Sequence, residues 1–141
     1  MSGSVRALTV YDSALYAAGD FIHASAESRR RIARWTGGAW NAVGNGLGTH
    51  YDGSGDVVYC LTVHDGKLIA GGRFALADNL PAANIAQWDG SSWQAVGGGT
   101  NAAVYAVTEY DGSLIAAGSF TTAGGVPANR IAVWVPAPGG E

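Results

Sequence analysis

Cysteine and histidine are the side chains of this sequence best suited to metal binding or nucleophilic catalysis, and they are few. The chain of 141 residues has one cysteine, Cys60, and three histidines, His23, His50 and His64. Zinc ligands usually follow short, regular spacings, and these four residues follow none. Cys60 aligns with alanines in the other copies of an internal repeat, as a small buried residue would. We therefore expect no metal, no cofactor and no catalytic residue.

Aspartates recur at positions that could supply carboxylates for acid–base chemistry or for calcium. Asp12, Asp65 and Asp111 are equivalent, and each is followed by glycine or serine between two apolar runs. This context is typical of a two-residue hairpin turn, because Asp and Gly tolerate positive φ. The run DGSGD at 52–56 alternates oxygen-bearing residues as a calcium loop does, but it is short and lacks the later glutamate. We interpret these aspartates as turn residues.

A threefold internal repeat accounts for the recurring residues. Segments 5–21, 58–74 and 104–120 read VRALTVYDSALYAAGDF, VYCLTVHDGKLIAGGRF and VYAVTEYDGSLIAAGSF, with offsets of 53 and 46 residues. The difference in offset places a loop insertion at 48–55. A period near 46 residues lies in the range of propeller blades. The matched positions that we interpret as structural are Gly19, Gly72, Gly118, Phe21, Phe74, Phe120, Trp35, Trp88 and Trp134.

Each copy predicts four short strands and no helix. In the second copy the strands are expected at 58–64, 68–72, 85–88 and 93–96. The connection 75–84 is expected to be a long loop. The strands are apolar on both faces, so each sheet must be covered on both sides, which neighbouring blades do in a propeller.

Two stretches, YDGSLIAAGSFTTAGGVPANRIAVW at 110–134 and WDGSSWQAVG at 88–97, carry a family resemblance. They resemble kelch-like and galactose-oxidase-like β-propellers, most of all the blades of the fungal cortical cell-polarity marker and related bacterial repeat proteins. The glycine pair after the second strand is kelch-like in position, although Gly71 is matched by Ala18 and Ala117. The resemblance implies a propeller of four-stranded blades, and it implies no single activity.

The third copy lacks its last strand, because Trp93 aligns with Gly139. We expect one all-β domain over 1–141, a propeller fragment with blades at about 5–47, 57–99 and 104–135. Its first and last blades would each expose an apolar face, so we expect the ring to close as a homo-oligomer. Two copies give six blades, within the usual range of about 4–8, so a homodimer is favoured and a homotrimer comes second.

The long loops are expected on one rim of the propeller, together with the connections into each first strand. Long loops on a rigid scaffold often carry function. The candidate binding residues on this rim are Arg6, Tyr59, Tyr105, Arg29, Arg30, Arg31, His50 and Tyr51.

Charge and hydropathy limit the partners. A net charge of −3 gives no general basic field for nucleic acid, and no apolar run approaches the roughly 20 residues of a membrane span. We expect neither a nucleic-acid nor a membrane partner. The first residues have no signal-peptide hydrophobic region, but a longer parent protein could be secreted, so localisation stays open.

These observations favour a non-enzymatic, self-assembling half-propeller, either a natural fragment or a designed chain. The alternative is a module that binds a carbohydrate or a protein through the long-loop rim. An enzyme of the galactose-oxidase kind is disfavoured, because its copper site needs Cys, Tyr and His ligands and Cys60 lies in an expected inner strand.

Overall fold

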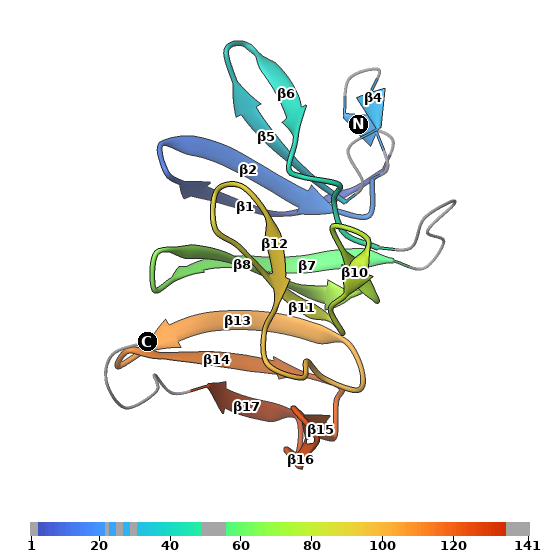
Figure 1. Ribbon diagram of the computed structural model, residues 1–141, viewed down its shortest axis with the longest axis vertical. Coiled ribbons are helices and arrows are strands. Elements are labelled where there is room, and N and C mark those ends of the chain that lie inside the picture. Colours follow the sequence, from blue (N-terminus) through green and yellow to red (C-terminus); the bar gives the residue numbers. More distant parts are fainter. Residues whose placement is uncertain (1–2, 22, 25–26, 29–30, 49–55, 135–141) are drawn as a thin grey trace.

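The structure is a computed structural model, and it describes residues 3–21, 23–24, 27–28, 31–48 and 56–134. Every regular element in these ranges is a β-strand, and three antiparallel sheets stack face to face as blades (Figure 1). The predicted all-β propeller fold is therefore confirmed. Within the described ranges, no helix is long and apolar enough to cross a membrane.

The first blade is a four-stranded antiparallel sheet in the order β1-β2-β5-β6. Its strands are β1 (Val5–Tyr11), β2 (Ala14–Gly19), β5 (Ile32–Thr36) and β6 (Ala39–Ala42). A separate two-stranded hairpin between β2 and β5 consists of β3 (His23–Ala24) and β4 (Glu27–Ser28).

The second blade repeats this plan in the order β7-β8-β11-β12. Its strands are β7 (Val57–His64), β8 (Lys67–Arg73), β11 (Ile85–Trp88) and β12 (Trp93–Ala95). The predicted strands are confirmed to within one residue at each end.

The third blade has three strands within the described residues, in the order β13-β14-β17. They are β13 (Val104–Tyr110), β14 (Ser113–Gly118) and β17 (Ile131–Trp134). A small hairpin precedes β17 and consists of β15 (Thr122–Ala123) and β16 (Val126–Pro127).

The expected long loop at 75–84 is wrong in one respect, because it contains a hairpin. Strands β9 (Leu76–Ala77) and β10 (Leu80–Pro81) pair across Asp78 and Asn79, whose φ angles are 52° and 64°. Asp and Asn are the residues other than glycine that most readily adopt positive φ. Asp78 and Asn79 therefore form a two-residue turn within the segment that the sequence predicts to be a long loop.

The turns between the first two strands of each blade have the predicted chemistry. Asp65 and Gly66 have φ angles of 52° and 73°, and Asp111 and Gly112 have 53° and 79°. Two successive positive φ values characterise the type I′ turn, whose twist matches that of the flanking strands. The interpretation of these aspartates as turn residues is confirmed.

The second strand of each blade has a glycine at or next to its end, Gly19, Gly72 or Gly118. At this residue the backbone lies close to the backbone at the start of the first strand. A Cβ there would collide with a backbone carbonyl oxygen at the start of the first strand, that of Ser4, Val57 or Ala103. Since a carbonyl in a paired strand cannot easily move, only glycine fits. This glycine recurs in every blade because the close contact between the first and second strands recurs.

Most of the core lies in two apolar layers between the blades. The first lies between blades one and two and includes Tyr16, Ile32, Leu68 and Trp88. The second lies between blades two and three and has Ile69, Ile85, Leu114 and Phe120 among its members. The three phenylalanines of the repeat, Phe21, Phe74 and Phe120, are all buried.

Candidate functional site

Three candidate residues of the long-loop rim come together in one row. Arg6, Tyr59 and Tyr105 occupy equivalent positions near the start of β1, β7 and β13. At each of these positions the pairing with the second strand shifts register. Such a bulge turns a side chain away from the regular alternation of a strand. The same local irregularity in three blades therefore presents the three side chains in one direction.

The row is held by contacts between neighbouring blades. The Tyr59 and Tyr105 rings have centroids 5.1 Å apart, and the Arg6 guanidinium carbon lies 5.8 Å from the Tyr59 centroid. Arg6 also pairs with Asp20 at 3.3 Å. Tyr105 ends the row and is 53% exposed. The row therefore leaves the Asp20-paired guanidinium of Arg6 and the ring of Tyr105 partly exposed to solvent.

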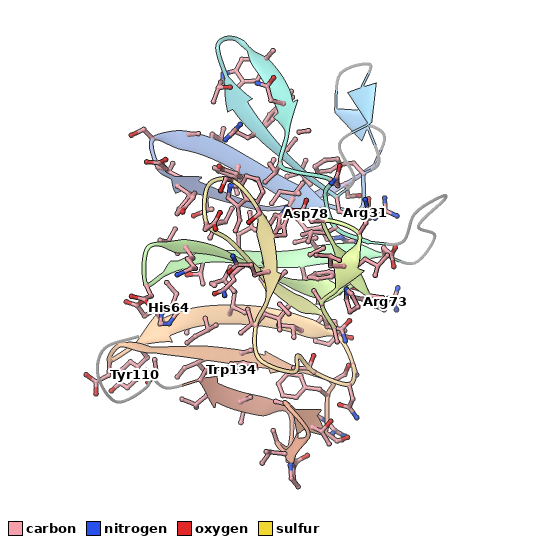
Figure 2. The ribbon with its side chains drawn as sticks, in the orientation of Figure 1. Arg31, His64, Arg73, Asp78, Tyr110 and Trp134 are labelled. Atoms are coloured by element: carbon pink, nitrogen blue, oxygen red, sulfur yellow. The ribbon has the colours of Figure 1, made fainter. Side chains whose placement is uncertain are left out.

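The remaining rim candidates are not part of this row. Arg31 is buried, 3% exposed, and its Nη1 donates to the Phe21 carbonyl oxygen at 3.3 Å. Figure 2 places Arg31 at the same end of the blades as Arg73. The candidates Arg29, Arg30, His50 and Tyr51 lie outside the described residues, as does most of the insertion at 48–55.

A hollow of about 450 Å³ lies next to the long loops of the second blade. Its walls include Asp56, Arg73, Pro81, Asn84 and Asn101. Asn84 is part of the wall itself, because its Oδ1 accepts the Phe74 N–H at 3.1 Å and its Nδ2 donates to the Thr100 carbonyl at 2.9 Å. The hollow is shallow and open to solvent, whereas small-ligand sites are usually clefts that enclose most of the ligand.

Sequence reasoning missed Asp56, Arg73 and Asn101 as wall residues. Asn101 links the connection before β13 to the third blade, since its Oδ1 accepts the N–H groups of Thr121 and Thr122 at 2.8 and 3.0 Å. The repeat gave no signal for these residues, because the loops differ between copies. Only the folded arrangement brings them together.

Cys60 has the properties of a packing residue. Its Sγ donates to the Gly71 carbonyl at 3.4 Å, and it packs against the layer between blades two and three. Burial raises the pKa of this thiol to about 12. Because the thiolate is the nucleophilic form, Cys60 is protonated and unreactive at neutral pH.

Among the histidines, only His64 has a side chain within the described residues. Its Nδ1 lies 2.6 Å from Oε1 of Glu109, so the pair links β7 to β13. Figure 2 shows His64 near Tyr110, at the tight-turn end of the blades and away from Arg73. Within the described ranges no cluster of three or more His, Cys, Asp or Glu could hold a metal.

The three repeated tryptophans differ in exposure because the blades differ in their neighbours. Trp88 is 3% exposed, and Trp134 is half-buried. Trp35 is 42% exposed, since no blade of the described part of the chain packs on the face that carries it. All three pair with a leucine of the second strand, in the same register.

Comparison with known proteins bears on the fold. A family model described as a domain of unknown function (DUF5122) beta-propeller matches residues 111–132, which span β14, the β15–β16 hairpin and the beginning of β17. No curated protein matches the chain significantly. The stacked four-stranded sheets and this match together support a β-propeller.

Proposed function

We propose that this chain is a non-enzymatic, kelch-like scaffold segment, and that two copies close into a six-bladed ring. The observation that carries the proposal is a difference between equivalent residues. Leu68 and Trp88 are 0% and 3% exposed in the second blade, whereas their equivalents Leu15 and Trp35 in the first blade are 37% and 42% exposed. We call the sheet face that carries them the leading face of each blade.

The opposite sheet face, here called the trailing face, differs in the same way. Ile32 and Ile85 are both fully buried, but their equivalent in the third blade, Ile131, is 57% exposed. Val133 on the same face is 55% exposed. Within the described residues, the stack of blades therefore has one uncovered leading face and one uncovered trailing face, and both carry exposed apolar side chains. Contiguous exposed apolar surface usually marks an interaction site.

A trailing face already packs against a leading face between the first and second blades, so we expect the two uncovered faces to fit each other. Inside the chain, the trailing residue Ile32 shares a core layer with the leading residues Leu68 and Trp88. The trailing face with Ile131 can meet the leading face with Trp35 of a second copy through the same kinds of residues. In a two-fold ring this contact forms twice, and no apolar end remains.

A polar contact between blades supports the same pairing. The Tyr11 hydroxyl donates to the Gly66 carbonyl of the next blade at 2.8 Å. Tyr110 is the equivalent of Tyr11 and is 71% exposed. In the closed ring its hydroxyl would reach the partner's Ser13, which is equivalent to Gly66. Arg6 of the partner would likewise extend the aromatic row beyond Tyr105.

The non-enzymatic part of the proposal rests on the roles of the reactive side chains. Cys60 is held protonated by burial, and the recurring Asp65 and Asp111 have positive φ in hairpin turns. His64 contacts Glu109 between two blades. Each of these groups has a structural role.

Light scattering coupled to gel filtration tests the closure. We expect a mass of twice the 14.4 kDa of one chain, and we expect Leu8→Asp to reduce it to one chain. Leu8 is 63% exposed on the free leading face, so this variant should keep its fold and its circular dichroism spectrum. A wild-type mass of one chain at micromolar concentration would refute the ring, and a mass of three chains would replace six blades by nine.

A second candidate function is ligand binding at the long-loop rim, by a glycan or a protein. The exposed Tyr105 at the end of the Arg6–Tyr59 row favours it, because aromatic side chains are common anchors in binding surfaces. A glycan array probed with the wild type and Tyr105→Ala tests it. Binding that Tyr105→Ala abolishes would support the rim as a site, and the absence of any glycan signal would count against a lectin.

A further inference from the structure

The outer edge of β17 has no paired strand within the described residues. Arg130 pairs inward: its N–H donates to the Phe120 carbonyl and its own carbonyl accepts the Gly118 N–H, both at 3.0 Å. Peptide groups alternate in direction along an antiparallel strand, so those of Ile131 and Val133 point away from β14. Among the described residues nothing pairs with these peptide groups, and such an edge is of the kind that accepts an added strand.

In the other two blades, a fourth strand pairs with the corresponding edge. The sequence of that strand indicates which kind of segment the edge of β17 can bind. In the first blade β6 pairs with β5 through Trp35–Trp40 and Arg34–Asn41. In the second, β12 pairs with β11 in the same register, through Trp88–Trp93 and Gln87–Gln94. The two occupying segments read WNAV at 40–43 and WQAV at 93–96. Both follow the pattern Trp-x-Ala-Val.

A matching space lies beside β17. A hollow of about 470 Å³ is bounded by the β15–β16 hairpin and by Ile131, Val133 and Trp134 of β17. In the second blade, β12 contacts β9 of the equivalent hairpin. The hollow therefore occupies the position that the fourth strand fills in the second blade.

The contacts of Trp93 indicate how a tryptophan would be held there. Its ring lies 5.4 Å from that of Trp88, and its Nε1 donates to the Val43 carbonyl at 2.9 Å. The equivalents in the next blade are the Trp134 ring and the Val96 carbonyl. Trp134 Nε1 would lie 3.2 Å from a Cβ placed on Gly97, so this ring already sits beside the segment that carries the Val96 carbonyl.

We propose that the outer edge of β17 binds an extended Trp-x-Ala-Val segment of a partner polypeptide as a fourth strand. The backbone of the segment pairs with Ile131 and Val133, and its tryptophan stacks on Trp134. Strand addition of this kind combines main-chain affinity with side-chain specificity. The site is independent of ring closure, because it uses the edge of the third blade and not its trailing face.

One difference between the blades provides a gain-of-function test. Asp78 accepts the Trp93 N–H at 2.9 Å and the Asn45 N–H at 2.7 Å. Its equivalent in the third blade is Gly124, whose φ of 60° is close to the 52° of Asp78. A Cβ on Gly124 would have no atom nearer than 3.9 Å. Gly124→Asp should therefore place a carboxylate where it can accept the N–H of a bound tryptophan.

The experiment uses a fluorescein-labelled peptide with the sequence of residues 89–99, DGSSWQAVGGG, and measures its binding by fluorescence anisotropy. Two control peptides replace the tryptophan by alanine or carry an N-methyl group on the glutamine, the residue whose N–H faces the edge strand. We expect each control to bind about tenfold more weakly or worse. We expect Gly124→Asp to bind the parent peptide several-fold more tightly than the wild type does.

Hydrogen exchange of the wild-type protein locates the site. The parent peptide should protect the Val133 amide and leave amides of β1, at the opposite end of the stack, unchanged. The Leu8→Asp variant should bind the peptide as the wild type does, whatever its mass, which separates this proposal from the ring. Failure of the peptide to bind, equal binding of the alanine peptide, or protection elsewhere would each overturn the proposed strand addition.

Discussion

At the scale of single residues, equivalent positions of the repeat can share a backbone conformation even where their side chains differ. Arg31, Asn84 and Arg130 are equivalent and differ in type, yet their φ angles are 68°, 68° and 74°. In each blade this residue exchanges hydrogen bonds with the segment around the phenylalanine that follows the second strand. A positive φ is unfavourable for a residue other than glycine. It is tolerated here because these backbone hydrogen bonds hold the residue that precedes the third strand in place.

The glycine at the close strand crossing leads to a first prediction. Gly72→Ala should lower the free energy of unfolding by about 1–3 kcal/mol, since its Cβ would meet the Val57 carbonyl in a paired strand. Gly71→Ala is the matched control. Its Cβ would meet the side chains of Val104 and Cys60, which can adjust more easily. Urea unfolding measures both, and a larger loss for Gly71→Ala would contradict this account.

The pKa of Cys60 leads to a second prediction. At pH 8.5 the folded thiol, with a pKa of about 12, should react with a maleimide far more slowly than the urea-unfolded chain, whose thiol has the ordinary value of 9.0. Because the folded state holds this proton more tightly, its contribution to stability is complete below pH 9 and is lost as the pH rises towards 12. Equal labelling rates in the two states would show that the thiol is not buried.

At the scale of the element, each blade depends on its neighbours. A four-stranded sheet with two apolar faces cannot be covered by its own strands. In the second blade both faces are covered, by the layers that contain Leu68 and Ile69. In the first and third blades, only one face packs against another blade within the described residues. Equivalent residues therefore contribute differently to the stability of the fold, depending on the blade in which they lie.

A third prediction compares one repeat position in two blades. Leu61 packs against the layer between blades one and two, whereas its equivalent Leu8 is exposed. Leu61→Asp places a charge at this layer and should destabilise the fold by about 3 kcal/mol or more, and Leu8→Asp should cost the single chain little. Circular dichroism melting of the two variants tests the difference. A cooperative, wild-type-like melt of Leu61→Asp would place the inter-blade layer elsewhere.

At the scale of the whole molecule, association and folding should be linked. The free leading and trailing faces carry residues whose equivalents are fully buried, so closure removes apolar surface from water. Anything that binds only the folded chain raises its apparent stability by mass action. Closure of the proposed ring would therefore contribute to the stability of each chain.

A fourth prediction follows from this linkage. The melting temperature of the wild type should rise as protein concentration increases from micromolar to hundreds of micromolar. That of Leu8→Asp should stay constant, because its leading face carries a charge in place of an apolar side chain. Calorimetry across the concentration range measures both. A wild-type melting temperature that does not change with concentration would argue against closure by a second copy.

Periodicity and turn chemistry were sufficient to predict the strands. The alternation of apolar residues and the Asp-Gly turns recur at fixed offsets, and such local signals determine strand bounds and hairpin type without knowledge of the whole. Gly19 and its equivalents were recognisable for the same reason. The hairpin around Asp78 was not, because neither other copy has an aspartate at that position.

The sequence by itself determined the all-β class, the three repeats and the positions that pack between blades. Only the tertiary structure decided which equivalent residues are covered. Trp35 and Trp88 are identical in type and in register, and they differ in exposure because, among the described residues, only the blade of Trp88 has a neighbour on its leading face. Likewise, Arg6 meets Tyr59 through contacts between blades. Local patterns repeat along the chain, whereas burial and contact depend on which blades pack against each other.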